Sequence, residues 1–290
     1  MKKLLLTGLL MLGAMGITGC TPERNQVDLK VQMQGQGMVE PSEGGKFTQG
    51  SVVDVKALPA TGWQFSRWEG AVAEAYRSET TVLMDGRKTI RAIFIPDSDP
   101  EIMEAPGGII NWRADGSEVL RRIGGEADIE YIMIHAISDA AANPSNPYEI
   151  SRIRDIFDSY GVESHYVIDR EGAIYQFVHD ERIAHHAGAG SWNQDPKLTN
   201  AMNRYAIGIE LLGIGTRAEM KDVIGTLANT QVRSADRGYT ENQYSALDHL
   251  LHHLMERYGI PRGNIIGHEA YDPGRKWDPG ALFDWNRILP

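Results

Sequence analysis

The chain has 290 residues, of which 42% are hydrophobic and 23% are charged, and its formal net charge at pH 7 is −10. This composition excludes an intrinsically disordered chain and is sufficient for a substantial core in more than one domain. The acidic balance argues against nucleic acid or anionic lipid as a partner bound through bulk electrostatics. Cys20 is the only cysteine, which excludes an internal disulfide.

Residues 1–19 have the build of a secretory signal peptide. Two lysines are followed by an apolar run from Leu4 to Ile17, which is too short to span a bilayer comfortably, and then by small residues. The stretch I-T-G-C that ends at Cys20 resembles the bacterial lipoprotein box. This resemblance implies cleavage before Cys20 and its lipidation. We therefore expect a cell-envelope protein anchored to a membrane through Cys20, the outer membrane if the organism is Gram-negative. An ordinary signal peptide with a chance cysteine is the alternative.

A short polar tether at residues 20–26 precedes a predicted all-β module at residues 27–95. Apolar and polar residues alternate there between Gly- and Pro-containing turns, as in VDLKVQMQG and TIRAIFI, which indicates short strands. The spacing of GMVEPSEGGKFTQGSVVDVKALPATGWQFSRWEG resembles the internalin-like bacterial repeat domain, in one copy. Trp63, Phe65 and Trp68 could stack on sugars, but aromatic residues of so small a module are more often its core. We interpret the module as a spacer or a weak wall-binding domain.

Residues 96–108 are acidic and Pro-rich without periodicity, so we expect a linker before a second domain at residues 109–290. In this second domain short apolar runs alternate with helical patterns at residues 148–160 and 241–258. The alternation predicts an α/β domain with a mixed central sheet flanked by helices. Residues 215–238 form a long polar connection. All nine histidines lie in this domain, so the chemistry is expected here.

The helix predicted at residues 241–258 carries three histidines at the spacing of metal ligands, His249, His252 and His253. A stripe of leucines lies on the opposite side of the same helix at 100° per residue. We therefore expect these histidines to face water and to bind no metal.

His135 and His268 each end an apolar run, at residues 129–134 and 264–267. Strand ends of an α/β sheet converge on one edge, where sites are common. A lone histidine of this kind is more often a hydrogen-bonded residue than a ligand. Together with Asp278, however, the two histidines make a set of two nitrogens and one oxygen, which suits Zn²⁺ and leaves a coordination position open.

Glu210 lies in the apolar strand pattern AIGIELLG, where a buried carboxylate costs several kcal/mol unless it is paired or used. A salt bridge to Arg204 and a catalytic role are equally compatible with the pattern. Lys276 lies two residues before Asp278, so an extended backbone would direct both side chains to one side. An ammonium beside a metal suits an oxyanion that develops between them.

Five motifs of the second domain resemble, in order and spacing, the zinc N-acetylmuramoyl-L-alanine amidases, which are related to peptidoglycan recognition proteins. They are IEYIMIHAISD, SHYVIDREGAIYQFVHDERIAHHAG, NRYAIGIELLG, YTENQYSALDHLLHHLMERYGI and GHEAYDPGRKWDPGALFDW. The resemblance covers nearly all of residues 109–288. Trp277, at a position that is often small or polar, and the long connection at residues 215–238 depart from the family pattern.

The resemblance implies a role for each matching residue. His135, His268 and Asp278 become the zinc ligands, Glu210 the acid/base, Lys276 the transition-state stabiliser, and His186 a residue of the substrate groove. The implied reaction is hydrolysis of the amide between N-acetylmuramic acid and L-alanine in peptidoglycan or muropeptides. A non-catalytic peptidoglycan-binding protein on the same fold, which would be expected to lack a ligand or the acid/base, and an adhesion protein led by the β module are the alternatives.

Overall fold

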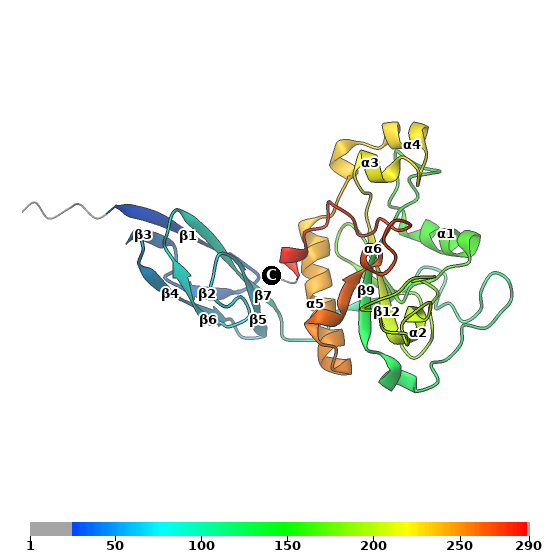
Figure 1. The fold of residues 1–290 in the computed structure, drawn as a ribbon, viewed down its shortest axis with the longest axis horizontal. Helices are drawn as coiled ribbons and strands as arrows, with labels where there is room; N and C mark the ends of the chain where they lie inside the picture. Colours follow the sequence, from blue (N-terminus) through cyan, green and yellow to red (C-terminus); the bar gives the residue numbers. More distant parts are fainter. Residues whose placement is uncertain (1–24, 289–290) are drawn as a thin grey trace, which may run out of the picture.

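The computed structural model of the protein describes residues 25–288 and consists of two parts (Figure 1). An all-β module lies at one end of an elongated molecule, and an α/β domain with a mixed central sheet lies at the other. This arrangement confirms the fold class predicted from the sequence. Cys20 and the rest of the signal sequence lie outside the described residues. Within residues 25–288 no helix has the length and apolar character needed to cross a membrane.

The β module is built from two sheets that share one core, with strand orders β3-β1-β7-β5 and β2-β4-β6. The strands are β1 (Gln26–Gln34), β2 (Gly37–Glu40), β3 (Gly44–Thr48), β4 (Val52–Pro59), β5 (Trp63–Gly70), β6 (Glu79–Leu83) and β7 (Lys88–Pro96). Trp68 is fully buried at the centre of this core, and Trp63 and Phe65 pack against it. The prediction that these aromatic residues form the core is confirmed.

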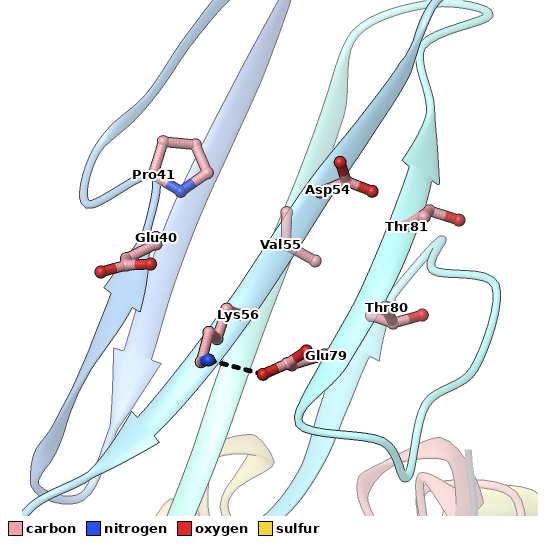
Figure 2. A pocket seen from close by; sticks show the side chains of 8 residues that line it. All are labelled: Glu40, Pro41, Asp54, Val55, Lys56, Glu79, Thr80 and Thr81. Atoms are coloured by element: carbon pink, nitrogen blue, oxygen red, sulfur yellow. Dashed lines mark ion pairs between the residues drawn. The ribbon is translucent and has the colours of Figure 1, made fainter.

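The outward face of the β2-β4-β6 sheet is polar at its centre (Figure 2). Lys56 on β4 and Glu79 on β6 are cross-strand neighbours, and their charged groups lie 2.5 Å apart. Both side chains are largely exposed. Because water screens such a pair, it adds little to stability.

The α/β domain has a six-stranded sheet in the order β13-β9-β12-β10-β11-β8. Its strands are β8 (Ile102–Glu104), β9 (Tyr131–Ile137), β10 (Tyr166–Ile168), β11 (Ile174–Gln176), β12 (Ala206–Leu212) and β13 (Ile265–Gly267). The four strands β13, β9, β12 and β10 are mutually parallel, and β12 is buried along its whole length. Burial on both faces explains why AIGIELL reads as a nearly continuous apolar run.

Part of the expected linker belongs to the sheet. Within residues 96–108, the segment Ile102–Glu104 forms β8 and pairs in parallel with β11. The three-residue strand has no periodicity of its own, and its conformation is fixed by hydrogen bonds to its neighbour. The linker is therefore shorter than the sequence indicates.

Helices flank the sheet, and α5 is the longest. The α-helices are α1 (Ile153–Tyr160), α2 (Met202–Tyr205), α3 (Arg217–Met220), α4 (Thr226–Gln231), α5 (Glu241–Tyr258) and α6 (His268–Tyr271). The 3₁₀ helices are η1 (Gly125–Asp128), η2 (Ile150–Arg152), η3 (Ser234–Asp236), η4 (Arg262–Asn264) and η5 (Trp285–Arg287). A capping box of Thr240 and Gln243 begins α5, and Gly259 ends it in the left-handed conformation, so its bounds follow from local signals.

The leucine stripe of α5 packs on the sheet, as the sequence predicts, but the histidines opposite it do not simply face water. His249 Nε2 lies 2.6 Å from the carbonyl oxygen of Ser98, and His253 Nδ1 lies 2.9 Å from Asp99 Oδ1. Nδ1 of His252 lies 2.9 Å from the carbonyl oxygen of Asp248 in the same helix. The expectation of solvent-facing histidines is therefore wrong, because the segment that connects the two domains lies across this side of α5.

The β module also contacts α5 directly, through a buried ion pair. Nη1 of Arg67 on β5 lies 2.7 Å from Oδ2 of Asp248 on α5, and both side chains are 2% exposed. The hydroxyl of Ser66 donates a second hydrogen bond to the same carboxylate oxygen at 2.8 Å. Nearby, the guanidinium of Arg262 lies over the ring of Tyr76 at 3.5 Å. The module is thus docked on the α/β domain rather than joined to it only by a linker.

Candidate metal centre

The two candidate histidine ligands lie at the same edge of the central sheet. His135 is near the carboxyl end of β9, and His268 follows directly after β13, the parallel neighbour of β9. Asp278 comes from the loop after α6, and its carbonyl oxygen accepts a hydrogen bond of 2.9 Å from the backbone N–H of Glu269. Because carboxyl ends of parallel strands meet at one edge, two ligands from the sheet and one from the loop converge there.

The donor atoms of these residues are close enough to share one ion. Nδ1 of His135 lies 2.9 Å from Nδ1 of His268 and 3.0 Å from Oδ2 of Asp278, and the third side of the triangle is 3.1 Å. All three residues are buried. Ligands bonded to zinc at about 2.0–2.2 Å lie on the order of 3 Å from one another. The set therefore fits a single zinc ion, with one coordination position left for another ligand.

The electrostatics of the triangle favour the protonation states that bind metals. Burial lowers the pKa of His135 to about 4, so its imidazole is neutral at pH 7. Burial alone would raise the pKa of Asp278, but the adjacent imidazoles of His135 and His268 outweigh it and hold this pKa well below its usual range. Neutral imidazole and ionised carboxylate are the forms that coordinate a divalent cation.

Glu210 on β12 is the cross-strand neighbour of His135 on β9. Its side chain is buried, and its Oε2 atom has no hydrogen-bond partner. Burial and the nearby charge of Asp278 raise the pKa of Glu210 well above its usual value, against a smaller lowering effect of Lys276. The alternative of a salt bridge to Arg204 is wrong, because Arg204 pairs with Asp128 at 3.3 Å. An orphaned carboxylate oxygen next to a metal triangle is suited to proton transfer.

Lys276 lines the same cleft as the triangle and Glu210, and its charge affects the pKa of both Glu210 and His135. Next to it Trp277 packs closely over two glycines. A Cβ atom added to Gly215 would lie 2.7 Å from the Trp277 ring, and one added to Gly280 would lie 2.8 Å from it. The unusual tryptophan therefore holds the loop that carries Lys276 and Asp278 against residues 215–238.

His186 lies behind His135. Its Nδ1 is 3.0 Å from Nε2 of His135, on the opposite side of that ring from the candidate metal ligands. Burial, followed by the neighbouring His135 and His165, lowers the pKa of His186 well below its usual value. The preceding residue, His185, is exposed. The geometry thus separates two adjacent histidines that the sequence pattern could not.

The cleft above the metal triangle has a volume of about 410 Å³ and is lined by both charged and apolar side chains. Its apolar lining residues include Tyr160 and Val162, at and just beyond the end of α1, and a second group of Met220, Val223 and Ile224. The second group comes from the connection at residues 215–238, which is predominantly polar in sequence. Its apolar residues have the i, i+3, i+4 spacing of a helix face, and this signal could have predicted a wall of the site.

The arrangement of these residues is suited to hydrolysis. Three ligands fit an open zinc position, Glu210 can accept or donate a proton, and Lys276 supplies a positive charge. A sequence profile of the N-acetylmuramoyl-L-alanine amidase family matches residues 125–281, more than half of the chain. The chain belongs to this family. A profile of the divergent InlB B-repeat domain matches residues 27–98, which confirms the internalin-like module.

Individual relatives of the amidase domain are also similar to the chain. The 1,6-anhydro-N-acetylmuramyl-L-alanine amidase AmpD of Haemophilus influenzae is 34% identical over 129 residues, which are 44% of this chain and 57% of the relative. The N-acetylmuramoyl-L-alanine amidase AmiD of Escherichia coli is 30% identical over 138 residues, which are 44% of this chain and 43% of the relative. The chain spans about half the length of these curated relatives.

Solved structures of amidases resemble the amidase domain as well. A selenomethionine derivative of AmpD is 25% identical, with a TM-score of 0.44, and the match covers 66% of this chain and 93% of that chain. AmiD of E. coli in complex with anhydro-N-acetylmuramic acid-L-Ala-D-γ-Glu-L-Lys is 25% identical, with a TM-score of 0.42 and 56% of each chain covered.

Proposed function

We propose that the protein is a zinc-dependent peptidoglycan hydrolase that cleaves the amide between N-acetylmuramic acid and L-alanine of the stem peptide. The observation that carries the proposal is the combination of a fitting zinc triangle with the unpaired, buried carboxylate of Glu210. A buried carboxylate without a hydrogen-bond partner lowers the stability of the fold, and a role in proton transfer explains why it is kept there. The names of the AmpD and AmiD relatives support the amide as the target.

In the proposed mechanism His135, His268 and Asp278 would hold zinc, which would supply Lewis-acid polarisation of the carbonyl and activation of a water molecule. Glu210 accepts the proton of the water as the oxygen attacks the carbonyl carbon. It then donates this proton to the amine of L-alanine as the C–N bond breaks. The ammonium of Lys276 stabilises the negative charge that develops on the carbonyl oxygen. The products are a muramic carboxylic acid and a peptide with a free amino terminus.

We further propose that the enzyme works in the cell envelope and is anchored there by lipid on Cys20. The support is the signal-peptide build of residues 1–19 and the lipoprotein-box resemblance at Cys20. Within the described residues the β module lies at one end of an elongated molecule and the amidase domain at the other, which suits a tether that precedes the module in the sequence (Figure 1).

The test is digestion of purified peptidoglycan and of soluble muramyl peptides by the zinc-loaded protein, with the products identified by mass spectrometry. We expect peptides that begin with L-alanine and glycans that carry free lactyl carboxylates. Cleavage between amino acids or between sugars would assign a different reaction. Zinc binding and peptidoglycan binding without any cleavage would instead establish a non-catalytic binding protein on the amidase fold.

A further inference from the structure

Two successive residues of the H-H-A-G stretch lie directly behind the two histidines of the metal triangle. Nδ1 of His186 lies 3.0 Å from Nε2 of His135, and the carbonyl oxygen of Ala187 lies 2.8 Å from Nε2 of His268. In both histidines Nδ1 faces Asp278 and Nε2 faces this stretch. The stretch therefore contacts the face of each ligand that a metal would not use.

The hydrogen-bond partners determine which nitrogen of each ring carries a proton. A carbonyl oxygen only accepts, so His268 must donate from Nε2, which leaves the lone pair of its Nδ1 free for a metal. Nε2 of His186 faces the carbonyl oxygen of Ala206 at 3.4 Å, a long contact in which only the nitrogen can donate. With its proton on Nε2, His186 presents Nδ1 as an acceptor, and His135 donates to it from Nε2. The lone pair of His135 Nδ1 is thereby directed toward the metal position.

His186 is itself held in place by the fold. The backbone N–H groups of His186 and Ala187 donate to Oδ1 of Asn203 at 3.0 and 2.7 Å. The ring of His186 fills the space beside Gly208 on β12, where an added Cβ would lie 2.7 Å from it. Because the ring cannot move far, it can fix the orientation of His135.

We propose that His186 is a positioning residue of the metal centre: its Nδ1 accepts a hydrogen bond from His135 and so holds the tautomer and ring orientation that present His135 Nδ1 to zinc. This role rests on the zinc site proposed above. It differs from the substrate-groove role that the family resemblance implies for His186. Partners of this kind typically contribute about 10- to 100-fold in metal affinity.

The experiment compares His186→Asn with His186→Leu in the full chain, with His185→Leu as the control at the exposed neighbour. Asn and Leu have the same branching and the same number of side-chain heavy atoms, but only Asn offers an oxygen near the position of Nδ1. Zinc affinity is measured by competition with a chromophoric chelator, and KM and kcat are measured on a muramyl peptide. We expect His186→Leu to weaken zinc binding by about 10- to 100-fold, His186→Asn to retain most of the affinity, and His185→Leu to leave it unchanged.

Each other outcome overturns the inference. If His186→Leu binds zinc as tightly as wild type but has a raised KM, His186 is a substrate residue and the zinc site stands. If Asn and Leu weaken zinc binding equally, the ring acts only by filling space. If wild type binds no zinc, the proposed function fails together with this role. NMR of the imidazole nitrogens in zinc-loaded wild type gives an independent check, since a proton on Nδ1 of His135 would refute the role even if both variants misfold.

Discussion

Removal of one partner from the buried ion pair of Arg67 and Asp248 is predicted to lower the free energy of unfolding by several kcal/mol. Replacement of Arg67 by Met keeps the apolar stem but leaves the carboxylate of Asp248 buried with the hydroxyl of Ser66 as its remaining partner from the module. Loss of one partner of a buried ion pair costs about 3–5 kcal/mol. We expect this decrease in the free energy of unfolding of Arg67→Met, measured by urea denaturation.

The exposed pair of Lys56 and Glu79 provides a matched control within the same module. Its atoms are as close, at 2.5 Å, but the side chains are 43% and 67% exposed. Exposed pairs contribute about 0–1 kcal/mol, so Lys56→Met should have little effect. A second variant, Arg67→Met with Asp248→Leu, removes both buried charges and should regain most of the lost stability. The reasoning is refuted if Arg67→Met costs no more than Lys56→Met, or if the double variant is as unstable as the single one.

Two further predictions concern pH and localisation. Burial raises the pKa of Tyr148 to about 12, above the value of about 10 in an unfolded chain. The stability that Tyr148 contributes is therefore complete below pH 10 and is lost as the pH rises through 12. Tyr148→Phe should reduce the decrease in the free energy of unfolding at alkaline pH. An unchanged decrease would contradict this assignment. Cys20→Ser should release the protein from membranes in a cell fractionation, whereas a variant that is still cleaved after residue 19 and stays bound in high salt would exclude the lipid anchor.

Much of the candidate site could be predicted because its residues lie at positions that the fold class brings together. His135 and His268 end apolar runs, and parallel strands place such ends at one edge. Asp278 and Lys276 were expected near each other from their separation of two residues. Glu210 stood out as a carboxylate in an apolar strand, and its lack of a hydrogen-bond partner for Oε2 fits that signal.

The contacts between distant segments could not be predicted in this way. Arg67 and Asp248 meet across the two domains, and no periodicity relates a charge on a strand to one on a helix far along the chain. The contact of His253 could not be predicted either. The spacing of apolar residues places His253 on the polar side of its helix, but it contacts Asp99 of the connecting segment. Ile102–Glu104 forms a strand because it pairs with β11, and its three residues show no strand pattern of their own.

The central claim is that one set of residues holds zinc and another performs the proton transfer. The most direct test measures zinc content and turnover of a muramyl peptide on the same folded samples of wild type, Asp278→Ala and Glu210→Gln. We predict that Asp278→Ala loses zinc and activity together, because one of three protein ligands is removed. Glu210→Gln should keep zinc and lose about 10²- to 10⁴-fold in rate, the usual contribution of a general acid/base. Wild-type turnover by Glu210→Gln, or full zinc content and activity in Asp278→Ala, would contradict the account.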